Sequence, residues 1–197
     1  MTTALPINQQ VNLNSLALET QDADLTGNLT VAGNATVTGN LTVTGTVTKT
    51  TPIVSLTTTA APTAAQSGTT FLLNATGGFV VTLPTAPSLG TEYKFVVGTL
   101  TTSSSTYKIL TPTSVYIVGT WPIFVTGALT STTAWESFAS LAGTTNRSIT
   151  MTCATPTTGG ATIGDCFTLT YYATGLWVLS SVQITGSGTL ATPFATS

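Results

Sequence analysis

Few side chains in this sequence are of a type that supports catalysis. The chain has no histidine among its 197 residues, so Ser-His and Cys-His pairs and histidine metal sites are excluded within one chain. What remains is a carboxylate pair, which can hydrolyse a glycosidic bond as acid and base. The candidates are Glu92, Glu136 and Asp165. Glu92 and Asp165 follow glycine-containing turns, where solvated carboxylates are common, so we predict no enzyme activity, no cofactor and no metal site.

Two cysteines flank a glycine-rich connection. Cys153 and Cys166 are predicted to lie on strands that pair with each other. An oxidising environment would join them in a cross-strand disulfide, whereas a reducing cytoplasm would leave two buried thiols. We favour the two thiols, with the disulfide as the open alternative.

Aromatic side chains are the remaining candidates for ligand contact. Trp121, Trp135, Trp177, Tyr171 and Tyr172 are of types that stack on sugar rings, although such residues more often fill a core or an interface. Neighbours on a strand face opposite sides, so at most one of Tyr171 and Tyr172 can enter the core. This pair is therefore the best candidate for a ligand-binding face.

Short strands must position these residues. Segments rich in Val, Ile, Phe, Tyr and Thr recur at close spacing, separated by turn sequences such as NATGG, TAPSLG and ATG. The expected strands are residues 69–74, 79–83, 92–98, 106–110, 114–119, 147–153, 166–172 and 176–184. No segment has a helix pattern longer than a turn or two. The sequence therefore predicts an all-β chain with a β-sandwich (jelly-roll-like) knob.

Charge and hydropathy exclude two classes of partner. Only 5% of the residues are charged, and the mean hydropathy is +0.40. No apolar run approaches the 18 or so residues that span a bilayer, so we expect no membrane partner and a buried apolar surface. The net charge is −2 and the four basic residues are scattered, so we expect no nucleic-acid partner. The first 24 residues contain no basic residue and no cleavage-site pattern, so we expect no secretory signal.

A hexapeptide repeat precedes the predicted knob. Residues 27–48 read GNLTVAGNATVTGNLTVTGTVT, with glycine opening each six-residue unit. Six is an even number, so the alternation of a strand continues from unit to unit. The apolar row is Leu29, Val31, Ala35, Val37, Leu41, Val43 and Val47. The opposite row is Asn and Thr, so the repeat predicts an extended strand with one apolar face.

One chain cannot stabilise this strand alone. Ordering six backbones costs roughly 6–12 kcal/mol, whereas burying one Leu and one Val returns about 3–6 kcal/mol. Three chains that share their apolar rows along one axis would supply the missing burial. The repeat therefore predicts a homotrimeric stalk with these seven residues at its axis. A Thr-rich hairpin within one β-domain is the alternative.

The repeat resembles the shaft repeats of phage tail fibres, tailspikes and other trimeric virion appendages. Residues 67–98 and 163–188 are similar, more loosely, to strand patterns of appendage proteins from phages and large DNA viruses. This resemblance implies a virion structural protein on the outer surface, either a trimeric capsid decoration protein or a short head fibre. The alternative is a tail-fibre protein that binds a host surface glycan. A cell-surface adhesin or surface-layer module would need an export signal.

Composition divides the chain into four segments. Residues 1–24 are expected to anchor the protein, 25–50 to form the trimeric β-helical stalk, 51–68 to act as a linker and 69–197 to form the knob. The anchor carries no repeat, so we expect it to fold on a major capsid protein or another virion protein. Its few apolar contact residues are Pro6, Leu13, Leu16 and Leu18.

Overall fold

The computed structural model describes residues 32, 38–40, 42–48, 50–102, 104–125, 135–140 and 144–197. The chain divides into two compact units, Met1–Val47 and Thr48–Ser197, and we call the second unit the body. The described residues form strands and a single 3-10 turn, so the all-β prediction is confirmed. Within this described part, no helix is both long and apolar enough to cross a bilayer.

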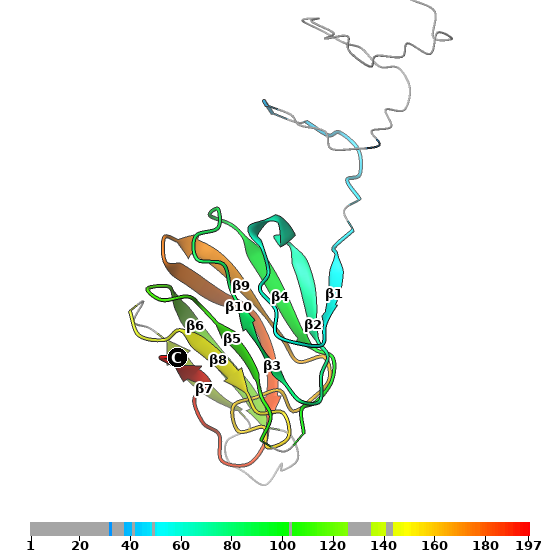
Figure 1. The fold of residues 1–197 in the computed structure, drawn as a ribbon. Helices are drawn as coiled ribbons and strands as arrows, with labels where there is room; N and C mark the ends of the chain where they lie inside the picture. The colour runs from blue at the N-terminus through cyan, green and yellow to red at the C-terminus, as the bar shows by residue number, and fades with distance from the viewer. Residues whose placement is uncertain are drawn as a thin grey trace, which may run out of the picture. The chain divides into compact units, whose positions relative to one another are not determined.

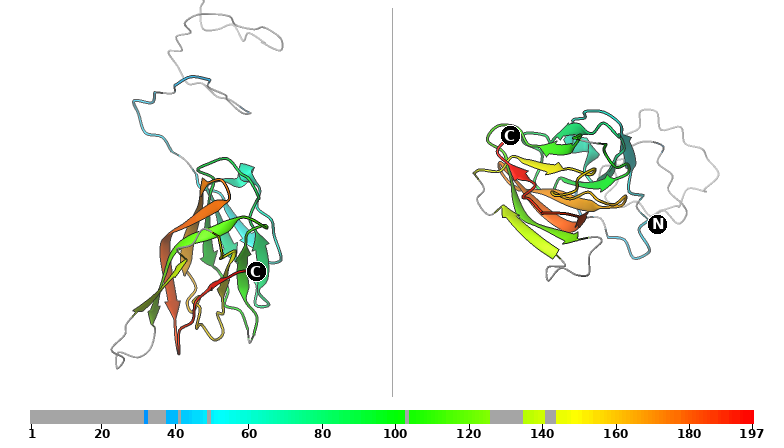
Figure 2. Two further views of the ribbon diagram at one scale, coloured as in Figure 1. Left: turned by 90° about the vertical axis from the view of Figure 1, so that its left-hand side faces the viewer. Right: turned by 90° about the horizontal axis from the view of Figure 1, so that it is seen from below.

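The named elements all belong to the body. They are β1 (Ile53–Leu56), η1 (Ala64–Gln66), β2 (Thr69–Leu73), β3 (Phe79–Thr82), β4 (Glu92–Val97), β5 (Tyr107–Leu110), β6 (Tyr116–Val125), β7 (Trp135–Ser140), β8 (Ser148–Met151), β9 (Cys166–Ala173), β10 (Leu176–Gly186) and β11 (Phe194–Ala195). Two sheets result, with strand orders β1-β2-β4-β9-β10-β6-β7 and β11-β8-β5-β3. Figures 1 and 2 show the sheets as two layers of the body.

The first half of the body winds between the two sheets. β1, β2 and β4 are parallel neighbours in the larger sheet, and β3 and β5 are parallel neighbours in the smaller one. Ala60 also bridges Val81 of β3 in parallel. The connectors that leave β2, β3, β4 and β5 each carry the chain across to the other sheet (Figure 1). A jelly roll is built from antiparallel strands, so the sheets are more mixed than the sequence analysis expected.

The second half contains a long antiparallel hairpin. β9 and β10 pair on either side of the Thr174-Gly175 turn, and β9 also pairs with β4. The register shifts between Ser180 and Gln183, where Ser181 has a φ of 49°. Such a bulge bends its strand and increases the local twist. β9 lies between β10 and β4 in the sheet. The neighbouring strands β4 and β9 carry several of the polar residues described below.

Alternating side chains build the core between the sheets. β2 and β9 point Phe71, Leu73, Phe167 and Leu169 inward, each at most 1% exposed, while Leu72 and Thr168 occupy the positions between them. Aromatic rings pack closely, as in the pair Phe71 and Phe95 at 5.7 Å between centroids. Burying each such side chain contributes roughly 1.5–3 kcal/mol. A chain with few charges therefore buries its apolar residues within the body.

The predicted linker is part of the body. Residues 51–68 contain β1 and η1, and β1 forms the edge strand beside β2. The hydroxyl of Tyr93 donates to the carbonyl of Thr63 at 2.8 Å, which ties the η1 region to the core. The folded body therefore begins before residue 69. The short segment IVSL was overlooked because one strand of four residues between polar stretches has little pattern of its own.

Candidate functional site

Glu92 lies far from the other two candidate carboxylates. Glu92 begins β4, whereas Asp165 lies beside Val97 at the other end of that strand, because Val97 N–H donates to the Asp165 carbonyl at 2.8 Å. At about 3.3 Å per residue the two ends are roughly 17 Å apart, beyond the roughly 5–10 Å of a glycosidase pair. Glu136 is exposed on β7, at the far edge of the larger sheet from β4. Glu92 therefore has neither Asp165 nor Glu136 at the spacing for glycoside hydrolysis.

Asp165 is a buried carboxylate, and the prediction of a solvated turn residue was wrong. Its side chain is 6% exposed. It accepts hydrogen bonds from the backbone N–H of Thr185 at 2.9 Å, from the Thr185 hydroxyl at 2.8 Å and from the N–H of Thr162 at 3.4 Å. Burial raises the pKa of this carboxyl, and the bonds from Thr185 oppose that rise. Asp165 therefore fastens the loop before β9 to the end of β10.

The Asp165→Asn variant should lose a pH dependence that the native protein has. Because the folded-state pKa of Asp165 lies above its ordinary value of 3.8, the folded protein binds this proton more tightly than the unfolded chain does. The stabilisation is complete below the ordinary value and is lost as pH rises through the raised pKa. Melting temperatures measured from pH 4 to 8 should therefore rise on acidification more in the native protein than in the variant. Parallel curves for the two proteins would contradict this assignment.

The two cysteines do not lie on paired strands. Cys153 follows β8 in the smaller sheet, whereas Cys166 opens β9 in the larger one. β8 pairs with β5 and β11, and β9 pairs with β4 and β10, so the predicted strand pairing is wrong. Both residues are buried free thiols. Burial raises the pKa of the Cys153 thiol, which lowers its reactivity.

The aromatic candidates divide between core and surface. Trp121 and Trp177 are fully buried, and the Trp121 indole N–H donates to the Thr158 carbonyl at 3.2 Å. Tyr171 is 3% exposed, and its hydroxyl accepts from the Gly175 N–H at 2.7 Å. Tyr172 is 71% exposed. Neighbouring tyrosines thus face opposite ways, and of these two Tyr172 is the one available to a ligand.

Trp135 is the fifth aromatic candidate. Its backbone pairs with Phe124 across β6 and β7. This places Trp135 at one end of the β6–β7 pair, which forms an edge of the larger sheet and is separated from β4 and β9 by β10.

Most residues of the predicted stalk and anchor lie outside the described ranges. These are Pro6, Leu13, Leu16 and Leu18 of the anchor and Leu29, Val31, Ala35, Val37 and Leu41 of the stalk. Val43 and Val47 are described, and in this single chain they are 49% and 70% exposed. Residues 42–48 carry no strand assignment, so the trimer axis stays a prediction.

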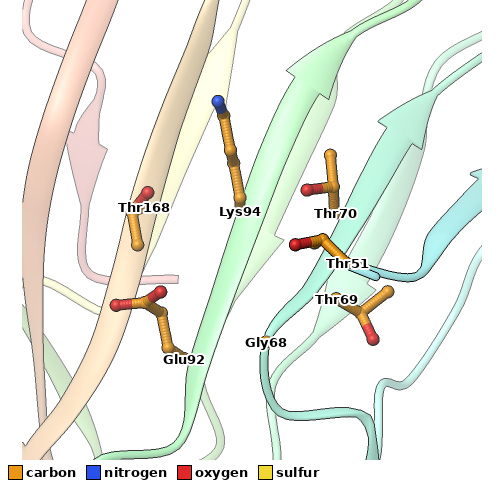
Figure 3. A pocket seen from close by; sticks show the side chains of 7 residues that line it. All are labelled: Thr51, Gly68, Thr69, Thr70, Glu92, Lys94 and Thr168. Carbon is orange, nitrogen blue, oxygen red and sulfur yellow. The ribbon is translucent and has the colours of Figure 1, made fainter. Parts of the chain in front are cut away.

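A polar groove of 390 Å³ lies on the larger sheet. Figure 3 shows its lining residues, which are Thr51, Gly68, Thr69, Thr70, Glu92, Lys94 and Thr168. Strand register explains why they meet, because Lys94 is paired with Thr70 on β2 and with Thr168 on β9. Glu92 and Lys94 are two residues apart on β4, so both project from the same, exposed face. The groove therefore combines one carboxylate, one ammonium group and several hydroxyls.

Glu92 was predicted only as a candidate acid or base, and Lys94 was not among the candidate site residues. The segment EYKF could have indicated the groove, since its charged residues alternate with aromatic residues that enter the core. The threonine neighbours come from β2 and β9, which are distant in sequence. Only the register of three strands brings them beside Lys94.

No known family model and no curated protein matches this sequence. Any functional conclusion must therefore come from the chain's own residues.

Proposed function

We propose that this protein is a virion structural protein, a homotrimer that decorates the capsid or forms a short head fibre. In this proposal, residues 1–24 attach it to a virion protein, residues 25–50 form the shared stalk and the body faces outward. The observation that carries the proposal is the hexapeptide repeat, whose apolar residues recur at the spacing that would put all of them on one face of an extended strand.

The described end of the repeat supports the need for partner chains. Val43 and Val47 belong to the apolar row, and both are largely exposed in one chain. Apolar side chains that recur in one row and lack cover within their own chain are suited to burial against other subunits. Three copies of the same row would meet in register, because identical chains share the same alternation.

The fold of the body supports the proposal that it is a separate unit facing outward from the virion. It has its own core between two sheets. Such a unit needs no cover from the stalk in order to fold. Its candidate carboxylates are dispersed or buried, which favours a structural or binding role over hydrolysis.

A chain that begins at Asp24 tests the anchor. We expect light scattering to give about three times the chain mass for both the full-length 20.0 kDa protein and the shortened form. Only the full-length protein should decorate particles that lack the native protein. If the shortened form decorates equally well, residues 1–24 are not the anchor. If the full-length protein is a stable monomer with full β-signal, the stalk proposal fails.

A tail-fibre protein that binds a host glycan is the second candidate. The exposed Tyr172 and the polar groove favour it, because a purely structural body has no need of either. Micrographs of particles labelled at the C-terminus separate the two roles. Label across the shell supports decoration or a head fibre, and label confined to the tail supports the receptor-binding role.

A further inference from the structure

The groove on the larger sheet has the chemistry of a binding site for an uncharged, hydroxyl-rich ligand. We propose that it binds one ring of a neutral saccharide, with Glu92 and Lys94 contacting ring hydroxyls and Tyr172 packing on the ring face. This site goes beyond the structural role above and deepens the glycan-binding candidate, for which it names the residues and the ligand class. Its volume of 390 Å³ lies within the roughly 300–1,000 Å³ of small-molecule sites.

The charges of the groove select against ions. Charged residues make up only 5% of the chain, yet two of opposite sign lie two positions apart here. An anion attracted by Lys94 would be repelled by Glu92, and a cation attracted by Glu92 would be repelled by Lys94. A neutral ligand meets neither repulsion, and it can use both groups as hydrogen-bonding partners.

The hydrogen-bonding groups match sugar hydroxyls. A carboxylate only accepts and an ammonium group only donates, whereas a hydroxyl does both. Adjacent hydroxyls of one ring can therefore donate to Glu92 and accept from Lys94. The Thr170 hydroxyl donates to Oε2 of Glu92 at 3.2 Å, which orients the carboxylate between β4 and β9. Thr70 and Thr168 flank Lys94 with further hydroxyls (Figure 3).

Tyr172 supplies the apolar surface that the groove lacks. It alternates with Thr170 and Thr168 on β9, on the face opposite the buried Tyr171. Thr170 is paired with Glu92, so Tyr172 is a diagonal neighbour of Glu92, with Cα atoms about 7–8 Å apart. That separation is within reach of an aromatic side chain. An exposed ring beside hydroxyl and charged groups can pack on the C–H face of a sugar.

Saturation-transfer difference NMR on the full-length protein tests the site. The probes are the methyl α-pyranosides of glucose, mannose and galactose. We expect transfer to at least one of them and no displacement by inorganic phosphate. Tyr172→Ala and Glu92→Gln should each weaken binding about 10-fold to 100-fold, as expected when a charged hydrogen bond or a stacking surface is lost.

Matched controls come from the same chain. Phe124→Ala removes another exposed aromatic residue, and Glu136→Gln neutralises another exposed carboxylate; both should bind as the native protein does. Lys94→Met should weaken binding, whereas Lys108→Met, on β5 of the other sheet, should not. No transfer to any of the three glycosides, transfer that survives Tyr172→Ala and Glu92→Gln, or displacement by phosphate would each overturn the proposal. None of these results would change the expected trimer mass or particle decoration.

Discussion

The Val43→Asp variant should be largely monomeric at concentrations where the native protein forms the proposed trimer. Val43 belongs to the apolar row of the repeat, so the substitution would bring three carboxylates to one dry axis. Unpaired like charges in such a place cost several kcal/mol unless they take up protons. Light scattering should show the mass fall towards the 20.0 kDa of one chain. Lowering the pH should partly restore the trimer, because protonated aspartates no longer repel one another.

Thr42→Asp is the matched control. Thr42 is the adjacent residue and belongs to the polar row, which the trimer proposal places towards water. This variant should keep the native mass, since an exposed carboxylate retains its hydration. Equal dissociation by both variants would mean that the alternation of the repeat is not the packing of the stalk.

The Gly78→Ala variant should lose about 2–5 kcal/mol of folding free energy. Gly78 has a φ of 62°, which costs a residue with a Cβ about 1–2 kcal/mol. The added methyl group would also overlap the carbonyl of Thr106 and lie 2.8 Å from the Thr106 nitrogen. Overpacking of this kind costs roughly 1–3 kcal/mol more, because the obstacle is backbone. Urea denaturation should show the loss as a lower midpoint with an unchanged slope.

Gly77→Ala is the control for this turn. An added Cβ at Gly77 has no atom within 4 Å. The substitution should therefore be neutral or stabilise by up to about 1 kcal/mol, through the reduced entropy of the unfolded chain. A similar loss from both variants would place the constraint in the turn as a whole instead of in the contact with Thr106.

Strands with regular alternation were predictable from the sequence alone. Residues 166–172 and 176–184 were expected as strands, and the structure has β9 over Cys166–Ala173 and β10 over Leu176–Gly186. In residues 167–171 apolar residues alternate with threonine, whereas residues 176–184 open with four apolar residues; the Thr174-Gly175 turn separates the two segments. β7 was missed, because WESFAS mixes a carboxylate and two serines with its aromatic residues. β11 was missed as well, since two residues carry no period.

The sequence by itself therefore determined the all-β class and that the two adjacent tyrosines face opposite sides of their strand, because both depend on local propensity and on alternation along one strand. The structure decided that Tyr171 is the buried one. Tertiary structure alone decided that the chain winds between two sheets, that Cys153 and Cys166 belong to different sheets and that Asp165 is buried against Thr185. The same holds for the groove, where Thr70, Lys94 and Thr168 meet through the register of β2, β4 and β9. A turn sequence specifies that the chain bends, but the partner of the next strand depends on which apolar faces can be buried together.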